Sequence, residues 1–338
     1  MVKLIKDLLW LKTKNIINNF SFIKWGHSIN MKKISFYYLI AFAMLPNLYG
    51  QQEWAFNQFM FNHQFFNPAY SGSKNESLVS IISKNQWINI DGAPRTRAVS
   101  YVSGLNKKNL AYSISGVSDL IGPINNLNTS LDIAYQLRLN DSNNFLGVGL
   151  KLSIDNLNFD YNALTFQTPN DPSINFNNEI NGFHTNIGFG LYFNSLNYYL
   201  GYSIPRMIEI KDFFYLKNHY VIAGGLLRLS DKNEIKPSLL LKFQEKSPIS
   251  FDLSILYYRN RSFWVGPQLK NFTNQNGLKD YFNISFLSGI HISNNLSIGY
   301  SYSNLINLNS AIGSSHEILL RFELKQKNLG TIRSPRIF

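Results

Sequence analysis

Beyond residue 75 the chain alternates apolar with small or polar residues, in segments of roughly ten residues separated by turn residues. In 296–303, which reads Leu-Ser-Ile-Gly-Tyr-Ser-Tyr-Ser, the even positions are apolar or aromatic and the odd positions are Ser or Gly. A period of two puts these sets on opposite faces of a β-strand. Such segments, repeated to the end of the chain, are typical of an outer-membrane β-barrel, so we predict an all-β, antiparallel transmembrane barrel over 77–324.

We count fourteen alternating segments, an even number as expected for a single-chain bacterial barrel, and leave twelve or sixteen open because segment boundaries are uncertain. The segments are 78–88, 95–104, 109–119, 127–139, 143–156, 182–194, 197–204, 219–230, 234–244, 249–259, 262–270, 280–292, 295–304 and 314–324. Tight hairpins are indicated at 141–144, 194–197 and 293–295, because Asn and Asp tolerate the positive φ of short turns. The long connections 156–181 and 205–218 are therefore predicted to face outside, and short turns to face the periplasm.

The two faces of a strand can be assigned from their charges. In 127–139 the odd positions are apolar apart from Thr129, whereas Ser130, Asp132, Gln136 and Arg138 share the even face with Ala134. A charge facing lipid is costly, so the polar face must line the interior. The interior charges predicted on this basis are Asp132, Arg138, Lys151, Asp155, Glu317 and Arg321, and pairs among the first three would order the lumen. A soluble β-sandwich also alternates, but it does not account for the leader, the many long strands and the aromatic density together.

Residues 31–50 have the three parts of a signal peptide. Met31-Lys32-Lys33 is followed by an apolar run over 34–45 and by a small residue, Gly50, after which we predict cleavage. The alternative, a single transmembrane helix, needs about 20 apolar residues, and this run is shorter. Residues 1–30 precede a complete signal, so we interpret them as an upstream extension from a wrongly assigned start, which leaves the true start codon open.

Composition agrees with a barrel. Hydrophobic residues make up 45% of the chain, yet the mean hydropathy is −0.13, as expected when only every second strand residue is apolar. The 19 Tyr and 26 Phe would supply the aromatic girdles at the two membrane interfaces. The chain has no Cys, which excludes disulfides. Half of the net charge of +12 lies in residues 1–33, and the remaining charges are scattered rather than clustered as in a nucleic-acid patch.

Several motifs resemble the PorP/SprF family of outer-membrane proteins, which is associated with type IX secretion and gliding in Gram-negative bacteria. They read Gln-Phe-Met-Phe-Asn at 58–62, Asn-Pro-Ala-Tyr-Ser-Gly at 67–72, Lys-Asn-Gln-Trp-Ile-Asn-Ile-Asp-Gly-Ala-Pro at 84–94, Asp-Leu-Ile-Gly-Pro at 119–123 and Gly-Ser-Ser-His-Glu-Ile-Leu-Leu at 313–320. Lys84 and Asn89 depart from the usual Arg and Gly, and the basic tail 325–338 extends past the usual end.

The resemblance implies an outer-membrane protein that binds, anchors or helps to export a large, gliding-adhesin-like surface protein through its type IX C-terminal domain. It also implies periplasmic partners, namely components of the type IX ring or peptidoglycan-binding proteins, and no enzymatic activity or cofactor. The residues do not distinguish a role in gliding from one in general secretion. The alternative function is a passive or hydrophobic-solute channel.

Two motif regions have physical interpretations that compete with functional ones. The segment 51–76 is too rich in Phe for a solvated tail, so we expect it to lie in the barrel or at its periplasmic mouth, the alternative being a mobile peptide. Trp87, Asp91 and Pro94 belong either to a contact surface for a partner or to a hairpin with an interfacial Trp and ordinary turn chemistry.

Aromatic residues of the long connections are the other candidates for partner binding, because aromatic side chains are favoured at interface hot spots. They are Phe159, Tyr161, Phe166, Phe213, Phe214 and Tyr215. The alternative is that these loops only cap the mouth of the barrel. His316 and Glu317 are adjacent in a strand and so point to opposite faces, which argues against a shared metal, and no catalytic motif is apparent.

Overall fold

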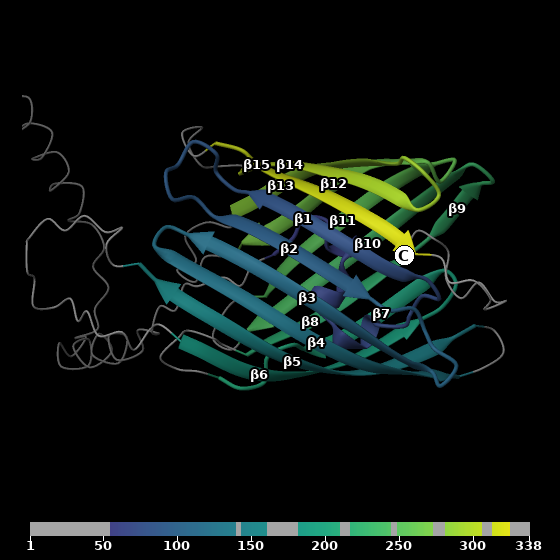
Figure 1. Ribbon diagram of the computed structural model, residues 1–338. Helices are drawn as coiled ribbons and strands as arrows, with labels where there is room; N and C mark the ends of the chain where they lie inside the picture. Colours follow the sequence, from purple (N-terminus) through teal and green to yellow (C-terminus); the bar gives the residue numbers. More distant parts are fainter. Residues whose placement is uncertain are drawn as a thin grey trace, which may run out of the picture. The chain divides into compact units, whose positions relative to one another are not determined.

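The computed structural model describes residues 55–139, 143–160, 182–209, 217–244, 249–272, 281–305 and 313–324, and in these ranges it is a β-barrel (Figure 1). Its strands are β1 (Ser77–Asn85), β2 (Arg95–Val102), β3 (Leu110–Ile121), β4 (Ile124–Arg138), β5 (Phe145–Phe159), β6 (Gly182–Asn194), β7 (Tyr198–Ile204), β8 (Asn218–Gly225), β9 (Leu227–Ser230), β10 (Asn233–Gln244), β11 (Ser250–Arg259), β12 (Phe263–Phe272), β13 (Tyr281–His291), β14 (Leu296–Leu305) and β15 (Ser315–Leu324). Neighbours in the sheet pair antiparallel, and β1 pairs with β15 from Ser77↔Leu324 to Asn85↔His316, which closes the barrel.

β8 and β9 are two parts of one strand, so the barrel has fourteen strands, as predicted. β10 pairs with β8 from Ser238 onward and with β9 only up to Ile235, and Pro237 lies between these two ladders. Proline has no N–H to donate to a neighbouring strand, which accounts for a break at this point. Leu226, the residue between β8 and β9, is buried and donates its backbone N–H to the Asn197 carbonyl at 2.7 Å.

The alternation of the sequence corresponds to the two faces of the wall. In β4 the side chains of Asn128, Ser130, Asp132 and Gln136 are buried, whereas Leu127, Leu131, Ile133, Tyr135 and Leu137 are exposed on the outer surface. The outer face is therefore apolar and the inner face polar, the arrangement that a lipid environment requires. Among the described residues no helix is long and apolar enough to cross a bilayer.

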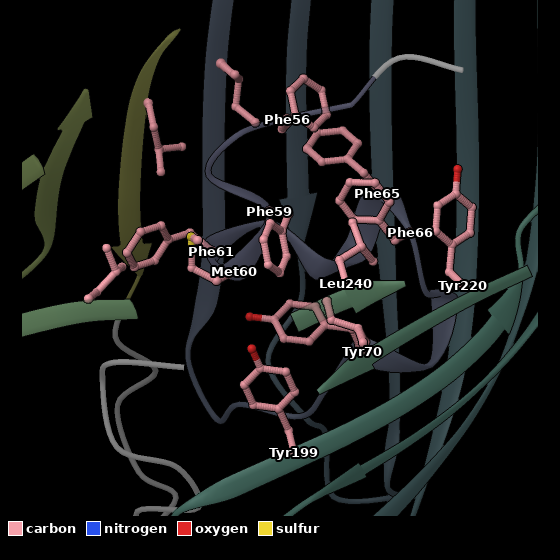
Figure 2. Packing of buried hydrophobic residues seen from close by; sticks show 14 of the residues in the cluster. Phe56, Phe59, Met60, Phe61, Phe65, Phe66, Tyr70, Tyr199, Tyr220 and Leu240 are labelled. Carbon is pink, nitrogen blue, oxygen red and sulfur yellow. The ribbon is translucent and has the colours of Figure 1, made fainter. Parts of the chain in front are cut away.

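The N-terminal segment 55–76, called the plug below, lies inside the barrel. It contains three short 3-10 turns, η1 (Phe59–Phe61), η2 (His63–Phe65) and η3 (Pro68–Tyr70). Every residue from Phe56 to Lys74 is buried, and the phenylalanines form an apolar cluster with residues of the wall (Figure 2). The plug thus supplies the core that the polar inner wall alone does not provide.

The two ends of the barrel differ in their connections. One, the short-turn end, carries the connections 103–109, 195–197, 231–232, 260–262 and 292–295. The other, the long-loop end, carries 86–94, 160–181, 205–217, 273–280 and 306–314, together with the two-residue turn 122–123. The plug begins at the long-loop end, where Lys84 Nζ donates to the Ala55 carbonyl, and it leaves at the short-turn end to enter β1.

Candidate functional site: the plugged lumen and the long-loop rim

Glu317 holds the first part of the plug. Its two carboxylate oxygens accept the backbone N–H groups of Asn57 at 2.7 Å and Gln58 at 2.9 Å. The Asn57 side chain in turn donates to Ser301 and Ser303 on β14. Hydrogen bonds to an ionised acceptor are stronger than neutral ones, so this carboxylate anchors the start of the plug to the wall. The neighbouring His316 faces the other way and contacts Tyr300, at 2.6 Å from its hydroxyl.

The Asn-Pro-Ala sequence at 67–69 sits against glycines of three neighbouring strands. A Cβ at Gly149 on β5 would lie 2.4 Å from Ala69 N, and one at Gly190 on β6 would lie 2.1 Å from Asn67 Oδ1. Gly201 on β7 leaves similar room for the Asn67 amide. Asn67 donates to the Leu191 carbonyl and accepts from Ala69 N, both at 2.9 Å. The plug therefore approaches the wall more closely than any side chain would permit.

His63 is fully enclosed in the middle of the plug. Its Nδ1 lies 3.0 Å from the Tyr192 hydroxyl, and its ring packs against the rings of Tyr70, Tyr192 and Tyr199. Burial, and then the nearby cations led by Lys236, hold the pKa of His63 well below its usual value. His63 is therefore neutral at physiological pH and acts as a packing residue of the plug.

The residues predicted to carry interior charges differ in their burial and in their partners. Asp132 and Lys151 form a buried ion pair at 2.8 Å between β4 and β5, and Lys151 also reaches the Gln64 carbonyl of the plug at 3.5 Å. Asp155 pairs at 2.9 Å with Arg206. Arg321 lies 3.5 Å from Glu323, and Glu317 binds the plug as described. Arg138, in contrast, is exposed at the last position of β4, so it takes no part in the Asp132–Lys151 pair.

Three motif regions meet at the long-loop end. The connection 86–94 lies beside the start of β15, because Ile88 N donates to the Ser314 carbonyl at 3.1 Å and Trp87 N to Ser315 Oγ at 3.3 Å. On its other side Gly122 N donates to the Gly92 carbonyl at 2.8 Å. We call residues 86–94, 119–123 and 313–315 the rim cluster. It is a compact surface built from segments that are far apart in the chain.

The rim cluster exposes apolar side chains. Ile88 is 55% and Ile90 40% exposed, and Leu120 and Ile121 are exposed beside them. Of the residues predicted to bind a partner, Trp87 is half-buried in the left-handed region with φ +46°, Asp91 is exposed and Pro94 is half-buried. All three belong to this surface.

Phe159 was predicted to lie in a loop, but it belongs to a strand. It is the last residue of β5 and pairs with Ile124, since β4 and β5 extend further than the alternation of apolar residues indicated. Tyr161, Phe166, Phe213, Phe214 and Tyr215 lie outside the described residues, as do the predicted signal peptide 31–50, the upstream segment 1–30 and the tail 325–338.

Sequence reasoning missed several residues that hold the plug. Lys236 donates to the Met60 carbonyl at 3.2 Å with its ammonium 4.9 Å from the Phe61 ring, and Gln136 donates to the Ala69 and Ser71 carbonyls. In the sequence, Lys236 and Gln136 each appear only as an inward-facing polar residue among small ones. This pattern does not reveal that they contact the plug. Within the described part of the chain no group of three or more His, Cys, Asp or Glu residues is placed to hold a metal ion.

A closed antiparallel barrel with an apolar outer face, a polar inner face and an inserted N-terminal segment defines the class of outer-membrane β-barrel proteins. Within this class, the family model of the type IX secretion system membrane protein PorP/SprF matches residues 48–322, so the chain belongs to that family. The barrel is accordingly a protein of the outer membrane that works with type IX secretion components. By the general rule for such barrels, the short-turn end faces the periplasm and the long-loop end the exterior.

Several solved outer-membrane structures are similar to the chain at low sequence identity. The outer-membrane protein Omp33 of Acinetobacter baumannii is 11% identical with a TM-score of 0.42, over 76% of this chain and 100% of that one. The CymD monoaromatic hydrocarbon channel is 13% identical with a TM-score of 0.44, over 80% and 94% of the two chains, and the KdgM porin is 8% identical with a TM-score of 0.35, over 72% and 98%. No curated protein matches the chain.

Proposed function

We propose that this barrel is a docking component of type IX secretion, which binds a large secreted surface protein at its outer rim and so anchors it or assists its export. The observation that carries the proposal is the plug. Because every residue from Phe56 to Lys74 is buried against the inner wall, the lumen is no route for a large polypeptide. A function in protein secretion would therefore use the surfaces at the ends of the barrel.

The rim cluster has the features of a protein contact surface. Ile88 and Ile90 are exposed at the outer end, and the backbone that carries them is held on both sides by the hydrogen bonds to Ser314 and Gly122. Exposed apolar side chains on an ordered backbone lose little conformational entropy on binding, which favours association. The C-terminal domain of the secreted protein is the partner that family membership suggests, and this surface is where we expect it to bind.

The test is purification of a tagged copy from native membranes in mild detergent, followed by mass spectrometry. We expect one large secreted protein with a type IX C-terminal domain to be enriched with the barrel. A variant with Ile88→Asp and Ile90→Asp should lose it. Ile249→Asp is the matched control, since Ile249 is 53% exposed at the same end of the barrel, beside β11. Recovery of the barrel alone, or equal recovery of the partner with the rim variant, would contradict docking at this surface.

A passive channel remains the second candidate, and one observation favours it. Ser254 on β11, Gln268 on β12 and Ser285 on β13 are paired in register and buried, yet their side-chain polar atoms have no hydrogen-bond partner among the residues that the structure describes. Buried polar groups of this kind are normally hydrated, so water beside the plug would satisfy them. A continuous file of water beside the plug would let water-sized solutes cross the barrel. Conductance of the purified barrel in planar bilayers tests this candidate.

A further inference from the structure

A small cavity lies at the short-turn end of the lumen, away from the rim. The plug contributes Tyr70, Ser73 and Lys74 to its lining, and the hairpin of β6 and β7 contributes Tyr192, Asn194 and Tyr199. The wall of this cavity therefore contains three phenol groups, an amide and an ammonium group. The docking function proposed above uses none of them.

Lys74 is the residue that gives the wall of the cavity a cationic group. It is 8% exposed, and its Nζ has no hydrogen-bond partner within the part of the chain that the structure describes. The closest carboxylate oxygen, Glu323 Oε1, is 4.0 Å away, and the same oxygen lies 3.5 Å from Arg321. Glu76 is a second carboxylate whose charge acts on Lys74. At 4.0 Å the contact between Lys74 and Glu323 is longer than a tight ion pair.

A third cation, Lys236, lies in the same region of the lumen. The Lys236 ammonium and the Arg321 guanidinium both lie by the Phe61 ring, at 4.9 Å and 5.9 Å from its centre. The charges that act on the central His63 are those of Lys236, Arg321 and Lys74, and all three oppose its protonation. Burying an ammonium group whose N–H groups lack hydrogen-bond acceptors is costly, so an anion beside Lys74 Nζ would be stabilised.

We propose that this cavity binds a small monovalent anion, such as chloride, with the Lys74 ammonium as its main ligand. The neighbouring phenols suit this role, because a Tyr hydroxyl can donate a hydrogen bond to an anion. Burial raises the pKa of Tyr70, so this hydroxyl keeps its proton. The cavity, at about 10 Å³, has room for little more than one water molecule, which restricts the site to a monatomic anion.

The protonation of Lys74 gives the site a predictable pH dependence. Burial, followed by the charge of Arg321, lowers the pKa of Lys74 to about 7, against the opposing effects of Glu323 and Glu76. A bound anion favours the charged form, so it raises this pKa, and by linkage binding strengthens as the pH falls through this range. His63, which faces the same region, stays neutral and does not compete for the proton.

The experiment uses the purified full-length barrel in detergent and measures thermal unfolding at constant ionic strength. Gluconate, which is too large for the cavity, is replaced by chloride. We expect the unfolding temperature of the wild type to rise, more at pH 6 than at pH 8, and the rise to disappear in Lys74→Gln. Lys108→Gln is the matched control, because Lys108 is an exposed lysine at the same end of the barrel.

A second readout does not depend on stability. The wild-type barrel should broaden the chloride NMR line, and Lys74→Gln should not. Lys74→Arg should retain part of the broadening because it keeps the charge. An equal rise in unfolding temperature for wild type and Lys74→Gln, or line broadening that survives this substitution, would overturn the proposal. Neither result would bear on docking at the rim.

Discussion

Gly190 faces the lumen from β6 at a point where the plug touches the wall. A methyl group there would lie 2.1 Å from Asn67 Oδ1 and 2.9 Å from Pro68 Cδ, so Gly190→Ala must displace this part of the plug. Overpacking of a well-packed interior costs about 1–3 kcal/mol, and we expect a loss of this size in the free energy of unfolding. Denaturant unfolding of the purified barrel measures it.

Gly116→Ala on β3 is the control for this substitution. A Cβ at Gly116 meets only Val99 Cγ1 at 3.8 Å, an ordinary contact, so the free energy of unfolding should change little. If the two alanine variants were equally stable, the close approach of Asn67 to β6 would not exist in the folded protein.

At the scale of single residues, sequence reasoning could see some features and not others. The alternation shows Gly188 and Gly190 as neighbours on one strand face, and it places His316 and Glu317 on opposite faces. It cannot show that Glu317 binds the backbone of Asn57, because 260 residues separate them and the contact depends on how the plug is folded. Such contacts follow from tertiary packing, which no local pattern encodes.

The pairing of β4 with β5 depends on a buried ion pair as well as on its backbone ladder. Asp132 and Lys151 are direct partners in the register, and Ser113 also donates to Asp132 at 2.8 Å. Removing one member of a buried pair leaves an uncompensated charge and costs about 3–5 kcal/mol, whereas removing both costs less. We therefore expect Lys151→Met to lower the free energy of unfolding strongly and the double variant with Asp132→Asn to recover part of the loss.

A double-mutant cycle measures this coupling, and Arg138→Met provides the comparison. Arg138 lies on the same strand but is exposed, so its substitution should be nearly neutral. Additive effects of Asp132→Asn and Lys151→Met would show that the two side chains do not interact in the folded barrel.

The number of strands could be predicted because each strand carries its own alternation of apolar and polar residues. The ends were less predictable where polar residues take part in the ladder, as with Asn125 and Asn126 in β4 and Asn158 in β5. The break between β8 and β9 was missed for another reason. The segment 219–230 reads as one strand, and the cause of the interruption, Pro237, lies on the neighbouring strand.

The whole molecule combines a closed wall with a segment that crosses its lumen from one end to the other. The plug starts near Lys84 and Glu317 at the long-loop end and reaches Glu323 at the short-turn end. Docking at the rim therefore does not require an open lumen, and the two properties can be tested separately. A channel, in contrast, requires the plug to move or to leave space beside it.

We expect the wild-type barrel to conduct little in planar bilayers and a variant lacking residues 55–66 to conduct strongly, because the plug fills the lumen.

A second variant covers the case in which the deletion does not fold. The chain has no Cys, so Asn57→Cys with Ser301→Cys, whose native side chains are 3.0 Å apart, places a unique thiol pair for a short bifunctional cross-linker. If the plug is static, cross-linking should change neither the low conductance nor the recovery of the secreted partner. A conductance that falls on cross-linking would show that the plug moves to open a path, and it would favour the channel over the docking function.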